Sequence, residues 1–220
     1  LQELGLPEAV LKKGGGKERR VQSAAVSCPH CGGSLTLHAP DKTERVVCPY
    51  CNSALDANQG KLTYLKTLDA FKTPLIPLGR KAEFEGQVLT VIGYMQRSTL
   101  LEGERWTWDE YLLYHPAIGY RWLVYSDDEW TYVKAVPAGE VSAGGGKASY
   151  AGRKFYCTQR SAGRVEHVVG EFYWKVEVGE MTDMEDYQSG GHRLSMEKYT
   201  YGDNSGEVTW SSGTPIASAT

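Results

Sequence analysis

Two pairs of cysteines constrain the fold of this chain more than any other feature. The first pair lies in Cys28-Pro29-His30-Cys31-Gly32, and the second lies sixteen residues further on, in Cys48-Pro49-Tyr50-Cys51. Each pair has the spacing that points two thiolates from a tight turn toward one metal ion, and two such turns complete a tetrahedron. The sequence therefore predicts a zinc ribbon over residues 26–57 with Cys28, Cys31, Cys48 and Cys51 as ligands.

Four thiolates around one ion leave no position open for a substrate, so we expect one structural Zn²⁺ rather than a catalytic one. A module of about 30 residues cannot build its own hydrophobic core, so metal binding contributes directly to folding. Iron in a rubredoxin-like site uses the same ligands and stays as an alternative. His30 lies between the two cysteines of the first pair, but it is not needed as a ligand because the four sulfurs already complete the tetrahedron.

The cysteine content also bears on where the protein works. Five cysteines, four of them in tight pairs, are typical of a metal site in a reducing compartment rather than of a disulfide set. The fifth, Cys157, is expected to pack within a strand. The net charge of −3 argues against a basic surface for nucleic acid. No run of about 18 apolar residues predicts a membrane helix.

The rest of the chain has the composition of a β protein. Fourteen Tyr and six Trp favour strands, and 25 Gly favour turns. We expect an N-terminal segment and linker at 1–25, the ribbon at 26–57, a connector at 58–78 and an antiparallel β domain at 79–216. This mainly β domain would form a barrel or a sandwich.

The β domain shows a weak internal repeat. Gln96-Arg97-Ser98 is echoed by Gln159-Arg160-Ser161, and each copy is followed by an acid and aromatic residues. The glycine-rich segment 142–147 would separate two similar halves, 79–141 and 148–216. In the second half, Trp174, Val176 and Val178 alternate with polar residues, which predicts a strand over 165–178.

Two carboxylates occupy corresponding places in this repeat. If the halves pack about a pseudo-twofold axis, Glu110 and Glu171 would meet in one pocket. Its walls would be Trp108, Tyr111, Phe172 and Trp174. Carboxylates among aromatic rings suit a polyamine-like organic cation. In the alternative interpretation, which we favour, each Glu accepts hydrogen bonds from a turn or pairs with an Arg of its own half.

Several of these strings resemble a known family. They are Trp108-Asp109-Glu110-Tyr111-Leu112-Leu113, Gly119-Tyr120-Arg121-Trp122-Leu123, Val169-Gly170-Glu171-Phe172-Tyr173-Trp174 and Glu207-Val208-Thr209-Trp210-Ser211. Together they resemble the bacterial domain of unknown function 4178 (DUF4178) over about residues 75–216. The resemblance implies a bacterial, cytoplasmic protein encoded near a spermidine-synthase-like enzyme, small membrane proteins and coiled-coil envelope-stress proteins. It implies no activity and no catalytic residues.

The sequence contains no nucleophile–base pair, and its glycine-rich Gly144-Gly145-Gly146-Lys147 fails the phosphate-loop pattern at Val141 and Ala148. We therefore expect a non-catalytic binding or scaffold protein, with protein partners in a membrane-associated bacterial complex. The alternatives are an enzyme or sensor for a polyamine-like cation that uses Glu110 and Glu171, and a zinc ribbon that grips nucleic acid.

Overall fold

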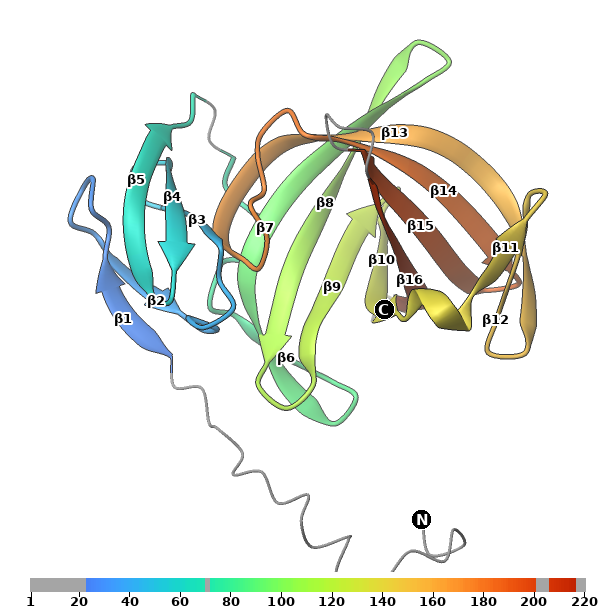
Figure 1. Ribbon diagram of the computed structural model, residues 1–220, viewed down its shortest axis with the longest axis horizontal. Coiled ribbons are helices and arrows are strands. Elements are labelled where there is room, and N and C mark those ends of the chain that lie inside the picture. Colours follow the sequence, from blue (N-terminus) through green and yellow to red (C-terminus); the bar gives the residue numbers. More distant parts are fainter. Residues whose placement is uncertain (1–22, 70–71, 201–205, 217–220) are drawn as a thin grey trace, which may run out of the picture.

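The protein is almost entirely β in a computed structural model that describes residues 23–69, 72–200 and 206–216. The expected N-terminal segment lies mostly outside these residues. A small cysteine-containing unit lies beside an eight-stranded antiparallel barrel (Figure 1). The prediction of a mainly β protein is confirmed. Of the two architectures expected for the β domain, a barrel or a sandwich, the structure shows the barrel. Within the described ranges, the helices are too short or too polar to cross a bilayer.

The cysteine-containing unit, which we call the ribbon, is built from five short strands. They are β1 (Ala24–Ser27), β2 (Ser34–Leu37), β3 (Arg45–Val47), β4 (Ser53–Asn58) and β5 (Lys61–Thr67). β1 pairs with β2 in a small separate sheet, and β3, β4 and β5 form an antiparallel ladder that continues the sheet of the barrel. The ribbon therefore reaches Thr67, ten residues beyond the expected boundary at 57, because β5 completes its sheet.

The barrel contains two four-stranded meanders. The first is β7 (Gln87–Leu101), β8 (Glu104–His115), β9 (Gly119–Ser126) and β10 (Glu129–Val136). The second is β13 (Arg153–Phe172), β14 (Met181–Ser189), β15 (His192–Thr200) and β16 (Gly206–Ile216). β7 pairs with β13 and β10 pairs with β16, both antiparallel, so the barrel closes between equivalent strands of its two halves.

Short elements decorate this barrel. They are β6 (Lys81–Phe84), the 3₁₀ turn η3 (Ala138–Glu140), β11 (Ser142–Gly144) and β12 (Lys147–Tyr150). β6 pairs with β7, and β11 and β12 form a hairpin that pairs with β13. The glycine-rich segment expected between the halves forms this hairpin, and Gly145 and Gly146 have positive φ angles at its turn.

The long strand β13 joins the ribbon to the barrel. Residues Gly170–Phe172 pair with Val47–Arg45 of β3 on one side, and Gly170 also pairs with Gly93 of β7 on the other. The strand expected to continue to residue 178 ends at Phe172. Phe172 pairs with Arg45, where β3 begins, and on the other side the part of β7 beyond Gly93 pairs with β6, so the backbone of residues 173–178 has no ladder to extend.

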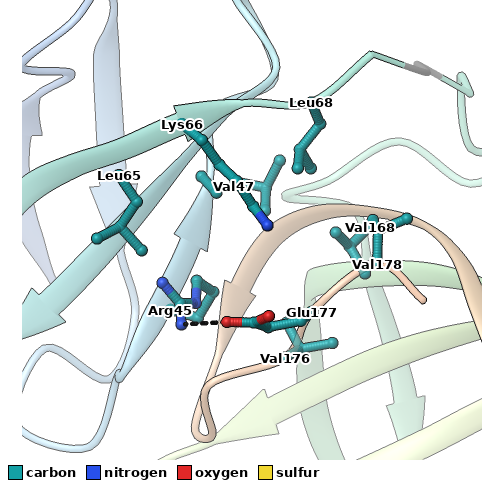
Figure 2. Close-up of a pocket in the computed structure, with 10 residues that line it drawn as sticks. Arg45, Val47, Leu65, Lys66, Leu68, Val168, Val176, Glu177 and Val178 are labelled. Atoms are coloured by element: carbon teal, nitrogen blue, oxygen red, sulfur yellow. Dashed lines mark ion pairs between the residues drawn. The ribbon is translucent and has the colours of Figure 1, made fainter. Parts of the chain in front are cut away.

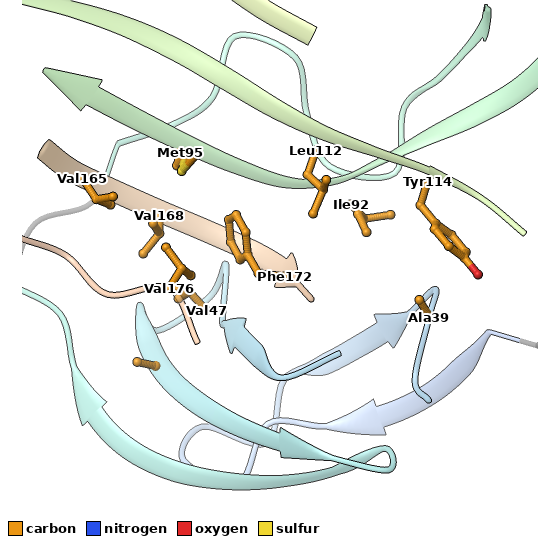
Figure 3. Packing of buried hydrophobic residues seen from close by; sticks show 11 residues of the cluster. Ala39, Val47, Ile92, Met95, Leu112, Tyr114, Val165, Val168, Phe172 and Val176 are labelled. Carbon is orange, nitrogen blue, oxygen red and sulfur yellow. The ribbon is translucent and has the colours of Figure 1, made fainter. Parts of the chain in front are cut away.

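The largest core cluster lies between the ribbon and the barrel, as Figure 3 shows. Barrel residues Met95, Leu112 and Phe172 meet Val47 and Ala54 from the ribbon. Trp174 and Val176, which follow β13, pack into the same cluster, and this explains their apolar character outside a strand. The ribbon therefore shares part of its core with the barrel. It also has a small hydrophobic cluster of its own around Leu35, Leu37 and Leu55, contrary to the expectation for so short a module.

Gly170 is required at the crossing of β13 and β7. Its φ is +95°, and a Cβ there would lie 2.4 Å from the carbonyl oxygen of Ile92 and 3.0 Å from the Cα of Gly93. We expect Gly170→Ala to lower the free energy of unfolding by at least about 3 kcal/mol, from backbone strain plus overlap with backbone atoms. Urea denaturation measures this, with Gly139→Ala as the control because its Cβ would meet nothing within 4 Å. Equal stability of the two variants would contradict this account of the crossing.

Candidate metal centre

Each cysteine pair lies on the same kind of turn. In the first, the N–H of Gly32 donates to the carbonyl of Cys28 at 2.9 Å. In the second, the N–H of Asn52 donates to the carbonyl of Cys48, also at 2.9 Å. Gly32 and Asn52 have φ angles of 75° and 56°, the left-handed conformation that Gly and Asn adopt most readily. The two turns are therefore structurally equivalent.

The turns bring the four predicted ligands together. The Sγ atoms of Cys28, Cys31, Cys48 and Cys51 all lie within 4.8 Å of one another. Cys28 and Cys51 are 3.8 Å apart, and Cys31 and Cys48 are 3.9 Å apart. Metal–sulfur bonds of about 2.3 Å would place the sulfurs of a regular tetrahedron about 3.8 Å apart. The predicted cluster is confirmed, and it could hold one metal ion.

The protonation of these thiols depends on their surroundings. Burial raises the pKa of Cys48 to about 12. Burial also acts to raise the pKa of Cys51, but hydrogen bonds from Ser53 and His30 outweigh it and lower that pKa to about 6. A bound cation would favour the thiolate at every position, because a coordinating thiol loses its proton. The donor set therefore fits a metal ion better than it fits four free thiols.

A chain of hydrogen bonds leads away from the sulfurs. The Oγ of Ser53 lies 3.2 Å from Sγ of Cys51, 2.9 Å from Nδ1 of His30 and 3.2 Å from Oγ1 of Thr67. The His30 ring stacks on Tyr64 with its centroid at 4.9 Å. His30 thus supports the cluster through Ser53. The role of Ser53 was missed from sequence, although its place two residues after Cys51 is a usable signal.

We expect Ser53→Ala to weaken the binding of a metal ion at the four cysteines by about 10- to 100-fold, the usual effect of removing an outer hydrogen-bond partner of a metal ligand. Ser53 is fully buried, so the alanine side chain fits but leaves His30 and Thr67 without their shared partner. Competition with a chromophoric zinc chelator measures the affinity. Ser34→Ala, at an exposed position in β2, is the matched control, and equal affinities for the two variants would refute this role of Ser53.

Glu171 attaches the barrel to the ribbon. Its carboxylate accepts hydrogen bonds from the backbone N–H of His38 at 2.7 Å, from that of Ala39 at 2.8 Å and from the hydroxyl of Thr43. Burial acts to raise the pKa of Glu171, but these hydrogen bonds and the His38 side chain outweigh it and hold the pKa below its usual value. The charged carboxylate therefore fastens the ribbon loop that precedes β3.

Glu110 lies in a different environment. It accepts a hydrogen bond from Nε1 of Trp108 at 2.6 Å and contacts Nη1 of Arg97 at 3.4 Å. Burial raises its pKa, against the attraction of Arg97. Glu110 lies on β8, the second strand of its meander, whereas Glu171 lies on β13, the first strand of the other. The two residues are not equivalent in the fold, and no contact between described residues joins them; their shared pocket stays a prediction.

The aromatic residues expected around that pocket also separate. Trp108 lies beneath the guanidinium of Arg97 at 5.5 Å. Tyr111 packs against Tyr94 in a second core cluster, where the connector residues Ile76 and Leu78 cover it. Phe172 and Trp174 pack edge to face at 5.1 Å within the core shared by ribbon and barrel.

A shallow pocket marks the junction between ribbon and barrel. Figure 2 shows Arg45 and Lys66 of the ribbon facing Val176 and Glu177 across it. Arg45 is buried and forms ion pairs with Asp56 and Glu177, both at 3.8 Å. Charge pairing thus reinforces this side of the junction.

Comparison with known proteins adds a family to this geometry. The family described as "Domain of unknown function (DUF4178)" matches residues 77–218, which cover the connector end and the whole barrel. The ribbon lies outside that match. Neither the curated proteins nor the solved structures gave a match. Because the matched region covers more than half of the chain, this protein belongs to the DUF4178 family.

Proposed function

We propose that the four cysteines hold one structural zinc ion. The observation that carries this proposal is the four-sulfur cluster, whose spacing suits metal–sulfur bonds of about 2.3 Å. Four protein sulfurs saturate a tetrahedral ion, so the centre has no vacancy at which a water or a substrate could bind. The role of the ion is then to hold the two turns of the ribbon together.

The ribbon in turn is part of the barrel's structure. β3 extends the ladder of β13, Glu171 fastens the loop before β3, and the two units share one core cluster. In this proposal the metal therefore fixes the end of β13 and the loop that follows it. We infer that the protein is a non-catalytic binding or scaffold protein whose two units present one rigid surface.

Exposed apolar side chains support the binding role. Tyr50 at the tip of the second cysteine turn is 67% exposed. Leu100 and Trp106, 65% and 52% exposed, lie near the tip of the β7–β8 hairpin, which projects beyond the barrel in Figure 1. Aromatic residues are enriched where proteins contact each other. The proposed partners are proteins, in a membrane-associated complex of the bacterial cytoplasm, the setting that the family resemblance suggests.

An affinity purification of the tagged full chain after cross-linking in bacterial cells tests this role. The wild type is expected to recover a reproducible set of partner proteins, and a Leu100→Ser/Trp106→Ser double variant is expected to lose it. Glu102→Ser, in the turn of the same hairpin, serves as the control. Recovery of no specific protein with the wild type, or of the same set with the double variant, would count against the proposal.

A further inference from the structure

The barrel interior contains a charged cluster that the metal centre does not use. Arg97 is only 2% exposed, and its Nη1 reaches Oε1 of Glu197 at 2.6 Å. Arg97 lies on β7 and Glu197 on β15, with β13 and β14 between them in the sheet. The side chain therefore crosses the lumen, and it passes Gly163 of β13 and Met184 of β14 on the way.

Negative charge exceeds positive charge in this cluster. Glu110, Glu180, Asp186 and Glu197 all interact electrostatically with Arg97 or with each other. Burial raises the pKa of Glu110, Glu180 and Asp186, and the charge of Glu197 adds to each rise. Among the described residues around them, Arg193 also attracts Asp186, but its guanidinium is paired with Glu129. Four carboxylates thus share one fully buried cation.

That cation is itself incompletely bonded. Nε and Nη2 of Arg97 are buried and have no hydrogen-bond partner within the described part of the chain. Only Nη1 is used, by Glu110 and Glu197. Buried N–H groups of a guanidinium are costly without an acceptor. The cluster therefore lacks two things at once, a positive charge near its carboxylates and an acceptor oxygen near Arg97.

Small residues line the lumen on this side, and the side chains of Arg97 and Met184 lie over Gly163. The register places Ser161 and Gly163 of β13, Ser195 of β15, and Ser211 and Gly213 of β16 on the same inner face. An eight-stranded barrel is either filled by its own side chains or holds one small ligand. Trp108 and Tyr199 add aromatic surface beside the carboxylates. Of the described residues, only the four cysteines group closely enough for a metal ion, so these carboxylates suit an organic cation better.

We propose that the barrel lumen binds a small amine that also carries a hydrogen-bond acceptor oxygen. The ammonium group would lie among Asp186, Glu197 and Glu110, over Trp108, and the oxygen would accept from Arg97. Glu197 is 25% exposed at its side chain, so the cluster can be reached from solvent. The proposal goes beyond the structural and scaffold roles, and it needs no participation of the metal centre.

Calorimetric titration of the full metal-loaded chain tests the proposal with three probes of similar size. They are 4-aminobutanamide, with both groups, n-butylammonium, with the charge alone, and butanamide, with the oxygen alone. We expect 4-aminobutanamide to bind most tightly and butanamide to bind at least tenfold more weakly. Binding of none of the three at tens of millimolar, or equal binding of butanamide, would overturn the proposal, as would calcium binding in place of the amines.

Two variants locate the site. Asp186→Asn keeps the oxygen that accepts from Ser195 but removes a negative charge. We expect it to lower the affinity for 4-aminobutanamide at least tenfold. Asp183→Asn removes the same charge from the exposed outer face of the same strand and is expected to change affinity less than twofold. Circular dichroism establishes that both variants are folded. Equal effects of the two substitutions would show that the amine binds elsewhere, which rejects the lumen as its site.

Discussion

Replacing Cys48 with serine is expected to abolish stoichiometric metal binding and to unfold the ribbon. Cys48 is fully buried, and its sulfur is one of four that would surround the ion. Structural zinc contributes about 10–16 kcal/mol to the folding of small zinc-binding peptides, and three ligands retain only part of that affinity. Hydrogen exchange measures the result as loss of amide protection in residues 24–67, together with residues 170–172 of β13, which pair with β3.

Cys157→Ser is the matched control for this experiment. Cys157 lies on β13, remote from the four-cysteine group, and its sulfur contacts the carbonyl of Gln159 at 3.5 Å. The control variant should keep its metal and its protection pattern. If Cys48→Ser retained full protection across β1 to β5, the ribbon would owe its fold to packing alone and the structural role of the ion would be wrong.

Glu171→Ala is expected to lower the free energy of unfolding by about 3–5 kcal/mol, since it removes the charged acceptor from buried donors of the loop before β3. The amides of His38 and Ala39 and the hydroxyl of Thr43 would then lie buried with one partner removed. Chemical denaturation measures the loss. Glu44→Ala removes an exposed carboxylate from the neighbouring part of the same loop and should cost less than about 0.5 kcal/mol. Comparable losses in both variants would contradict the attachment role of Glu171.

The pH dependence of this attachment follows from the direction of the pKa shift. The pKa of Glu171 in the folded protein is below its usual value of 4.5. Its stabilisation is therefore complete above pH about 4.5 and is lost as the pH falls through the lower, folded-state pKa. The stability difference between the wild type and Glu171→Gln should shrink over that acidic range. A difference that stays constant down to pH about 2 would show that the charge of Glu171 contributes nothing.

The metal ligands could be predicted from sequence because their geometry is local. Each C-x₂-C pair fixes its own turn, and only the meeting of two turns depends on the rest of the fold. The partners of Glu171 could not be predicted, since His38 lies 133 residues away and the contact exists only after β3 pairs with β13. Glu197 is likewise separated from Arg97 by 100 residues.

The residues expected around a pocket shared by Glu110 and Glu171 illustrate a different limit of prediction from sequence. Consecutive residues of a strand point to opposite faces, so Glu110 and Tyr111 cannot line one pocket in a regular β8. The structure shows this separation, with Glu110 beside Arg97 and Tyr111 in the cluster under the connector. The repeat of the two halves was visible in the sequence. Aligning the halves by their similar strings, however, matched Glu110 of β8 with Glu171 of β13, and these strands are not equivalent in the two meanders.

The structural role of the ribbon depends on one metal ion enclosed by the sulfurs of Cys28, Cys31, Cys48 and Cys51. Zinc content and X-ray absorption of the full chain, purified without added metal, test it together. We expect one zinc per chain with four sulfur neighbours at about 2.3 Å. A chain that carries no stoichiometric metal and whose four thiols react freely with a thiol reagent, or an ion bound by nitrogen or oxygen, would contradict it.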